Sequence, residues 1–176
     1  MNGESSYRRF LDGDESAASE VIKIYREGLT FFIYRYVKNA DVAEDIAIDV
    51  FSELFIKTRY NFKVSLKTYL FMLAKSRALN YIKRNKVIVM TELTGSEADS
   101  ALTPESHLLQ KEKYLNLHSA ISELPSDMRS AIHLIYFEKM SHTEAAKILG
   151  VNEKRVYNLL YSAKRKLREK LGGEDK

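Results

Sequence analysis

The chain has 176 residues, 45% of them hydrophobic, and a formal net charge of +4. This length can bury one ordinary core or two small ones, and the absence of cysteine excludes disulfides and thiolate zinc sites. The four histidines lack metal-ligand spacing, no apolar run is long enough for a membrane span, and the N-terminus has no apolar signal core. We therefore expect a cytoplasmic protein with no cofactor and no membrane insertion.

Charge is divided along the chain into four zones. Residues 1–56 carry a net −5, and residues 57–86 carry a net +9 from nine basic residues and no acid. Residues 87–110 carry a net −4, and residues 111–176 a net +4. Such segregation predicts separate surfaces for separate partners, and the basic zone favours a polyanion.

With only two prolines and seven glycines, the sequence predicts an all-α fold, and three helices are expected in its first part. The first covers about residues 16–37, starting near Asp14 or Ser16, with a possible break at Gly28. The second begins at Asp41, the expected cap, with Glu44 as its capping-box partner. The third covers about residues 65–86. Helical spacing predicts one broad buried side on the second helix, made of Ile46, Val50, Leu54, Ala43, Ala47, Phe51 and Phe55.

The helical pattern stops between Val87 and Thr103, in an acidic stretch of small and polar residues that we predict to be a flexible linker. Its carboxylates could repel or mimic DNA, or the stretch could be a disordered spacer. We predict two small helical domains, at residues 1–86 and 105–176, with the acidic linker at 87–104. The second domain should contain four helices. Its first helix, restarted by Thr103 and Pro104 and ended by Pro125, has the apolar stripe Tyr114, Leu117, Ile121 and Leu124.

A helix-turn-helix is predicted from Ser141 to Leu171. Ser141 and Glu144 form an S-x-x-E capping box, Gly150 can supply the positive φ of a tight turn, and Asn152 can cap the second helix. Val151 is expected to turn inward. The buried stripe of the second helix is predicted to contain Val156, Leu160, Ala163 and Leu167.

The opposite face of this second helix is predicted to meet duplex DNA. Its first turns offer side chains that can reach base edges in a major groove, namely Glu153, Lys154, Arg155 and Asn158. Basic side chains that suit phosphates follow at Lys164, Arg165, Lys166, Arg168 and Lys170. The alternative is an ordinary helical hairpin with a solvated basic end.

Aromatic residues alternate with basic ones between Lys57 and Lys86. Exposed rings can stack on unpaired bases while the cations follow the phosphates, so this stretch suits a single strand. The alternative is that the rings belong to the core. We favour the core for Phe71 and Tyr81, and for Tyr60 and Phe62 both interpretations stay open.

Four stretches of the sequence, in order, resemble an extracytoplasmic-function (ECF) sigma factor of bacterial RNA polymerase. They are AEDIAIDVF at 43–51, YLFMLAKSRALNYIKR at 69–84, LPSDMR at 124–129 and the helix-turn-helix. The resemblance covers about residues 15–86 and 105–171. It implies that region two melts the promoter and reads the minus-ten element as a single strand, whereas region four reads the minus-thirty-five element as duplex. The implied partners are core RNA polymerase, promoter DNA and an anti-sigma factor.

The same resemblance assigns roles to individual residues. Glu44, Asp45 and Asp49 fall where the family docks on the clamp helices of the polymerase's largest subunit, although acids also favour a helix start. The loop Asn61–Ser65 matches the loop that captures a flipped base. The strand-contacting set contains Asn61, Phe62, Lys63, Ser65, Tyr69, Arg77, Asn80, Lys83 and Arg84. Departures from the family's usual residues occur at Ile48, Tyr69, Tyr157, Leu159 and Ser162.

Two other classes of protein compete with the sigma factor. A DNA-binding regulator acting without polymerase would normally present a dimerisation surface or a ligand domain. An enzyme acting on nucleic acid is supported least, because the sequence shows no nucleophile–base pair, paired catalytic carboxylates, phosphate-binding glycine loop or metal spacing. We therefore predict a promoter-recognising sigma factor that is not an enzyme.

Overall fold

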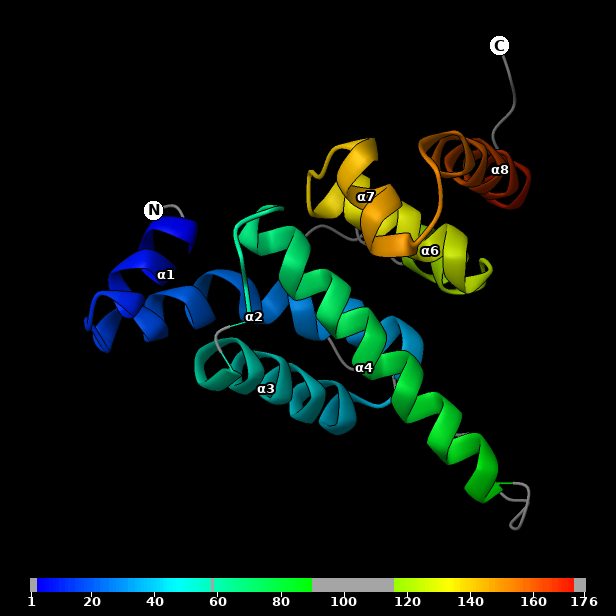
Figure 1. The fold of residues 1–176 in the computed structure, drawn as a ribbon. Helices are drawn as coiled ribbons and strands as arrows, with labels where there is room; N and C mark the ends of the chain where they lie inside the picture. Colours follow the sequence, from blue (N-terminus) through cyan, green and yellow to red (C-terminus); the bar gives the residue numbers. More distant parts are fainter. Residues whose placement is uncertain (1–2, 58, 90–115, 173–176) are drawn as a thin grey trace, which may run out of the picture.

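The computed structural model describes residues 3–57, 59–89 and 116–172, and this part of the chain contains helices and loops without strands (Figure 1). The prediction of an all-α fold is confirmed. Residues 116–122 are also helical and precede the C-terminal helices. The helices are α1 (Gly3–Leu11), α2 (Ser16–Val37), α3 (Ala40–Lys57), α4 (Leu66–Val89), α6 (Ser126–Ile132), the π-helical turn η1 (His133–Phe137), α7 (His142–Leu149) and α8 (Glu153–Leu171).

Helix α1 was not predicted from the sequence. It ends before Gly13, whose φ of 100° lets the chain reverse into α2. The Asp14 carboxylate then accepts a hydrogen bond from the backbone N–H of Ser16 at 3.1 Å, as expected for a helix start there. Tyr7 is fully buried between α1 and the rest of the N-terminal half. This helix therefore belongs to the core rather than to a loose N-terminus.

Helix α2 continues through Gly28 without the possible break. A Cβ at this position would lie 2.5 Å from a carboxylate oxygen of Glu138, so the glycine makes room for a side chain from the C-terminal half. The start of α3 also differs from the prediction. The side chain of Asn39, not that of Asp41, accepts the hydrogen bond from the Val42 N–H at 3.0 Å. Glu44 is free of the expected capping box and instead contacts Arg26 of α2.

The C-terminal half follows the predicted order of helices. Leu124 and Ile121 are buried as expected, whereas Leu117 is 38% exposed. Thr103, Pro104, Tyr114 and most of the predicted linker lie outside the described residues, and α4 extends to Val89, beyond the predicted end at Lys86. After α6 the chain passes through η1, whose wider turn places His133 and Leu134 inside the core.

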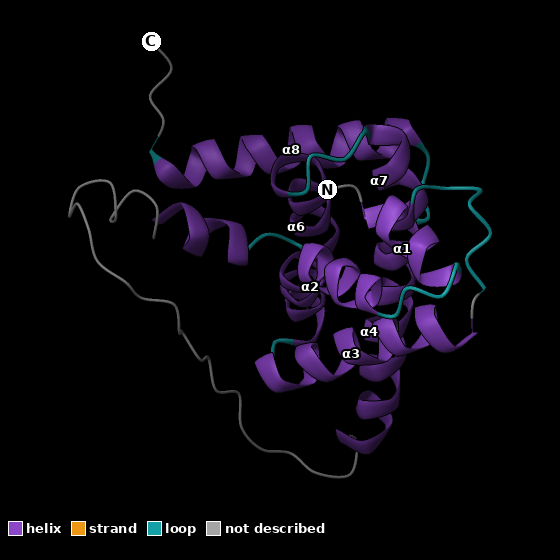
Figure 2. Ribbon diagram, turned by 90° about the vertical axis from the view of Figure 1, so that its left-hand side faces the viewer, coloured by secondary structure: helices purple, strands orange, loops and turns teal. Residues whose placement is uncertain are grey.

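The two helical halves share one continuous set of buried side chains, and Figure 2 shows their helices lying against one another. Helix α7 packs against α4, and α6 packs against α2 and α8. His133 is 2% exposed at this junction, with its ring 5.7 Å from that of Phe32 and 5.8 Å from that of Phe137. Of the two possibilities that the chain length allowed, one core is therefore realised. None of the helices in the described part is long and apolar enough to cross a membrane.

Candidate nucleic-acid interface

The helix-turn-helix is built by local hydrogen bonds, as predicted. Ser141 Oγ accepts from the Glu144 N–H at 3.2 Å, and the Glu144 carboxylate accepts from the Ser141 N–H at 3.0 Å, which completes the capping box. Gly150 has a φ of 70°, and Asn152 Oδ1 accepts from the Arg155 N–H at 2.8 Å. Each helix end thus satisfies its own backbone groups, which fixes the start of α8.

Val151 does not turn inward and is 37% exposed. Its backbone N–H donates to the Ala146 carbonyl at 3.0 Å and closes the end of α7, so the backbone of Val151 is fixed while its side chain stays at the surface. Within α8, Val156, Leu160 and Ala163 are buried as predicted, and Leu167 is half-buried. Leu159 is also buried, so the apolar stripe is wider than expected.

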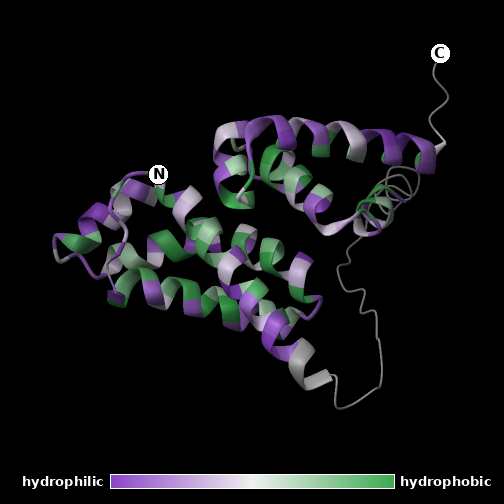
Figure 3. Cartoon of the chain, turned by 45° about the vertical axis from the view of Figure 1, so that its right-hand side comes forward, coloured by the Kyte–Doolittle hydropathy of each residue, from purple (hydrophilic) through white to green (hydrophobic). Residues whose placement is uncertain are grey.

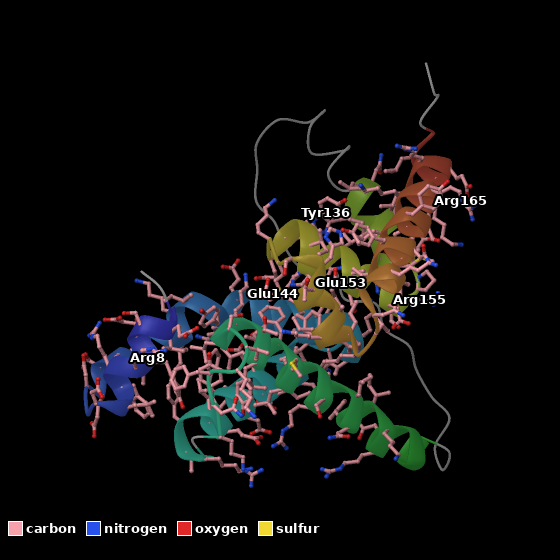
Figure 4. The ribbon with its side chains drawn as sticks, turned by 45° about the horizontal axis from the view of Figure 1, so that its top comes forward. Arg8, Tyr136, Glu144, Glu153, Arg155 and Arg165 are labelled. Carbon is pink, nitrogen blue, oxygen red and sulfur yellow. The ribbon has the colours of Figure 1, made fainter. Side chains whose placement is uncertain are left out.

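The outer face of α8 is polar along its length (Figure 3). All the side chains predicted to meet duplex DNA are exposed, although Lys170 also pairs with Glu123: Glu153, Lys154, Arg155, Asn158, Lys164, Arg165, Lys166, Arg168 and Lys170. Figure 4 shows Arg155 and Arg165 spaced along this helix, far from α1. Glu153 accepts a hydrogen bond from Thr143 Oγ1 at 2.9 Å, which ties the start of α8 to α7. Lys154, Arg155 and Asn158 therefore project from the first turns of a fixed helix, the arrangement that reads base edges in a major groove.

Two tyrosines on the same face were not predicted as site residues. Tyr157 is 55% exposed and stacks on His142, with ring centroids 4.1 Å apart and an interplanar angle of 12°. Tyr161 is 71% exposed. The sequence signal was their position, since residues 154, 157, 158 and 161 share one helical face. This face therefore combines cations with exposed rings.

The loop before α4 holds its shape through its own polar groups and through aromatic packing. Tyr60 is 5% exposed and donates from its hydroxyl to the Val64 carbonyl at 2.8 Å. Asn61 Oδ1 accepts from the Lys63 N–H at 3.2 Å, and Phe62 adopts a φ of 59°. Phe62 is 37% exposed with its ring 4.6 Å from that of Tyr60. The question left open by the sequence is thereby answered: Tyr60 belongs to the core, and Phe62 lies at the surface.

Helix α4 carries the other predicted strand-contacting residues. Tyr69 is half-buried with its ring 5.2 Å from that of Tyr60, and burial raises the pKa of its hydroxyl. Asn80, Lys83 and Arg84 are exposed in the C-terminal half of α4, and the end of this helix extends beyond the other helices in Figure 1. At 1.5 Å per residue they lie roughly 16–23 Å along the helix from Tyr69, so loop and helix form an elongated surface. Phe71 is buried, as favoured, and Tyr81 packs against the edge of the core.

Several polar groups of this segment contact other helices instead of solvent. Arg77 forms an ion pair with Glu53 of α3, and the Arg77 guanidinium, as the main cause, lowers the pKa of that carboxyl. Ser65 Oγ donates to Glu144 Oε1 at 3.1 Å. Lys67 and Lys75 donate to the carbonyls of Glu138 and Leu149 at 2.6 Å and 2.5 Å. Lys67 and Lys75, two of the nine basic residues between positions 57 and 86, thus hold the C-terminal half against α4. Their spacing in the sequence could not reveal this role.

Glu44, one of the acidic residues of α3, borders an apolar groove. Asp45 and Asp49 are exposed as solvated carboxylates, whereas Glu44 accepts hydrogen bonds from Arg26 Nε at 2.7 Å and Thr30 Oγ1 at 3.3 Å. A groove of about 490 Å³ lies beside them, lined by α2 and α3. Ile48 and Ile56 are 54% and 79% exposed there. Exposed apolar side chains rimmed by charge are typical of an interaction surface. The family resemblance had assigned the acidic residues to docking, whereas the groove itself was not predicted from the sequence.

Comparisons with family models place both halves. The model described as Sigma-70 region 2 matches residues 21–87, and the model described as Sigma-70, region 4 matches residues 114–167. Among curated relatives, RNA polymerase sigma factor SigV of Bacillus subtilis is 30% identical over 145 residues, covering 81% of this chain and 83% of the relative. The ECF RNA polymerase sigma factor SigM of the same organism is 24% identical over 151 residues, covering 85% of this chain and 91% of the relative.

Solved structures show the same fold. The sigma factor RpoE from Bartonella quintana, in complex with the anti-sigma factor NepR, aligns with a TM-score of 0.71 and 22% identity, covering 89% of this chain and 98% of that one. CnrH, in complex with the cytosolic domain of CnrY, aligns with a TM-score of 0.67 and 15% identity, covering 97% of both chains.

Proposed function

Because the chain belongs to the ECF sigma factors, which direct core RNA polymerase to promoters, we propose that its two basic surfaces divide promoter recognition between them. The family consists of DNA-recognition subunits rather than enzymes. In our proposal α8 reads the minus-thirty-five element as duplex, and the loop 59–65 with α4 binds the melted minus-ten strand in the cytoplasm. The domain boundaries at residues 86 and 105 are part of this proposal.

One observation carries the assignment of α8. Lys154, Arg155 and Asn158 are exposed on the first turns of a helix whose start is fixed by the Asn152 cap and the Thr143–Glu153 hydrogen bond. A helix held in this way can insert its N-terminal turns into a major groove without losing order on binding. The strand surface is supported by its exposed cations and by Phe62, a partly exposed aromatic ring of the kind that stacks on unpaired bases.

The polymerase-binding face is the acidic and apolar side of α3 in this proposal. Asp45, Asp49 and Glu44 lie next to the groove that exposes Ile48 and Ile56. Carboxylates around an apolar centre match a partner that presents basic residues around an apolar ridge. An anti-sigma factor, a partner that the family resemblance implies, would exclude the polymerase if it covered this groove.

Run-off transcription with purified core enzyme tests the overall function. We expect specific start sites on a genomic library when the chain is added to core polymerase, and weak duplex binding by the chain alone, because each basic surface is small. If the chain directed no start site and yet bound duplex DNA tightly and specifically by itself, the result would favour a DNA-binding regulator that acts without polymerase.

A pre-melted bubble template separates the two DNA surfaces. Arg155→Ala and Asn158→Ala should impair transcription from duplex and bubble templates alike, because duplex contacts upstream are lost in both. Lys83→Ala and Arg84→Ala should regain most of their transcription on the bubble, because the melting step is bypassed, although their affinity for the melted strand stays reduced. The opposite pattern of rescue would mean that the two surfaces are assigned the wrong way round.

Charge reversal tests the polymerase face. Asp45→Lys with Asp49→Lys should weaken core-polymerase binding while helicity stays unchanged, because both carboxylates are exposed. The matched control is Asp12→Lys with Glu15→Lys, two exposed acids near the turn between α1 and α2. Equal losses for both pairs would point to net charge rather than to a docking surface.

A further inference from the structure

Helix α1 lies directly against the loop that binds the melted strand in our proposal. The Arg8 guanidinium carbon is 4.5 Å from the centroid of the Phe62 ring, a cation–π geometry. Residues 3–11 precede the part of the chain that the region 2 model matches. Figure 4 shows Arg8 on α1, on the side of the molecule opposite to Arg155.

The position of α1 is fixed by buried contacts. Tyr7 donates from its hydroxyl to the Leu54 carbonyl at 3.3 Å, and its ring lies 5.6 Å from Tyr60 and 6.2 Å from Phe62. Ser6 donates to Glu20 at 2.7 Å. The helix therefore holds Arg8 beside the loop, and little order has to be gained when a ligand arrives.

Two neighbouring arginines on α1 have different surroundings. Arg9 is held between two carboxylates, with Asp14 at 2.5 Å and Glu20 at 3.1 Å. Arg8 has one carboxylate, Glu4, at 3.5 Å in an exposed i,i+4 pair, and its side chain is 62% exposed. Such a pair contributes little free energy. Arg9 thus anchors the helix, whereas the guanidinium of Arg8 can exchange Glu4 for another anion.

We propose that α1 forms a second wall of the single-strand site and that Arg8 contacts a phosphate of the melted strand. This inference rests on the proposed role of the loop 59–65. The guanidinium lies over the Phe62 ring, and its N–H groups can donate to phosphate oxygens once a phosphate replaces Glu4 in the exposed pair. Lys63 and Arg59, both exposed in the loop, extend the same cationic surface. The ligand class is an unpaired nucleotide with its flanking phosphate.

The experiment uses holoenzyme and a bubble template built on a start site found by run-off transcription, with affinity measured against salt. Arg8→Ala should weaken binding roughly tenfold, the size of one charge-assisted hydrogen bond. The slope of log affinity against log salt should fall by about 0.7, the value for one phosphate contact on a single strand. Arg8→Lys should keep the slope. Lys23→Ala, an exposed charge on α2, is the matched control and should bind like the parent chain.

Three results with the Arg8 and Phe62 variants would contradict the proposal, and each would show which part of it is wrong. An Arg8→Ala variant with the parent affinity and slope would show that Arg8 does not contact the strand. Weaker binding with an unchanged slope would reduce Arg8 to a residue that positions Phe62, which also contradicts a phosphate contact. Phe62→Leu tests the loop itself: if this variant binds normally, the proposed strand site fails; if it binds weakly while Arg8→Ala binds normally, only the role of α1 fails.

Discussion

The two DNA-binding surfaces acquire their shapes in different ways. The start of α8 is fixed by contacts within residues 141–155, from the Ser141–Glu144 capping box to the Asn152–Arg155 cap. The loop 59–65 depends on residues far away in the sequence. Tyr7 packs under it from α1, and Glu144 of α7 accepts the hydroxyl of Ser65 across 79 positions. One surface is therefore local, and the other is a product of tertiary packing.

This difference predicts how each surface fails. A local surface tolerates changes elsewhere in the fold, because its helix ends satisfy their own backbone groups. A loop shaped by distant side chains changes when those side chains change. The strand surface should thus be the one sensitive to remote mutations, and the duplex surface the one sensitive only to its own residues.

The largest effect is expected at Tyr7. Tyr7→Ala removes a fully buried ring and should lower the free energy of unfolding by about 3–5 kcal/mol, while impairing the strand surface that rests on it. Urea unfolding monitored by circular dichroism measures the loss. Tyr161→Ala, which removes a 71% exposed ring from α8, should change stability by less than about 0.5 kcal/mol. Similar losses of stability in the Tyr7 and Tyr161 variants would contradict the proposed difference between a packed strand surface and a local duplex surface.

The duplex surface should fail through single contacts. Arg155→Ala or Asn158→Ala should cost about 1–3 kcal/mol of promoter affinity and relax preference at one or two base pairs. Competition between holoenzyme complexes on randomised upstream sequences measures this change. Lys164→Ala, farther along α8, serves as the control and should weaken all sequences alike, because phosphate contacts carry no sequence information. Equal loss of preference in all three variants would remove the base-reading role.

Glu144 tests the point where the two regions meet. Glu144→Ala removes one half of the capping box and also the acceptor for Ser65 and Thr68, at 3.1 Å and 3.2 Å. We expect a loss of about 1–2 kcal/mol in stability. Asn152→Ala, which removes only a helix cap, should cost about 1 kcal/mol and leave the loop before α4 unchanged. Hydrogen exchange of the backbone amides of residues 59–68 distinguishes the two variants, because only Glu144→Ala should make it faster. Unchanged exchange in the Glu144 variant would show that the contact of Glu144 with Ser65 and Thr68 does not support the loop.

The smallest effect concerns pH and the buried junction. Burial among aromatic rings, with a further contribution from Arg35, lowers the pKa of His133 below its usual 6.5. The unfolded chain therefore binds a proton that the folded chain excludes, so stability is complete above that value and falls as the pH drops through it. Burial also lowers the pKa of His118. Replacing both by Gln should flatten the stability profile between about pH 5 and 7; a profile as steep as that of the parent chain would assign the dependence to other groups.

Much of the fold was predictable because its signals are local. The periodicity of Ile46, Val50 and Leu54 gave the buried side of α3, and Ser141, Gly150 and Asn152 gave the helix-turn-helix. The exposed positions of Arg155 and Asn158 followed from the same spacing. In each case the interaction joins residues three or four positions apart, which the sequence shows directly.

Other features followed from contacts that cross the chain. Helix α1 went unpredicted, although Tyr7 and Phe10 had helical spacing, because so short a segment becomes stable mainly by packing. Gly28 suggested a helix break, yet it accommodates Glu138, a partner more than a hundred positions away. Lys67 and Lys75 were read as part of a nucleic-acid surface and instead hold the C-terminal half.

The sequence by itself determined the helix-turn-helix with its caps and which face of α8 is polar, since these depend on backbone hydrogen bonds and side-chain spacing within a few residues. The tertiary structure alone decided that Tyr60 is buried while Phe62 is exposed, that Arg8 lies on Phe62 and that Ser65 contacts Glu144. These outcomes depend on which distant surfaces pack together, and a buried hydrogen bond or ring contact exists only once both partners have been placed.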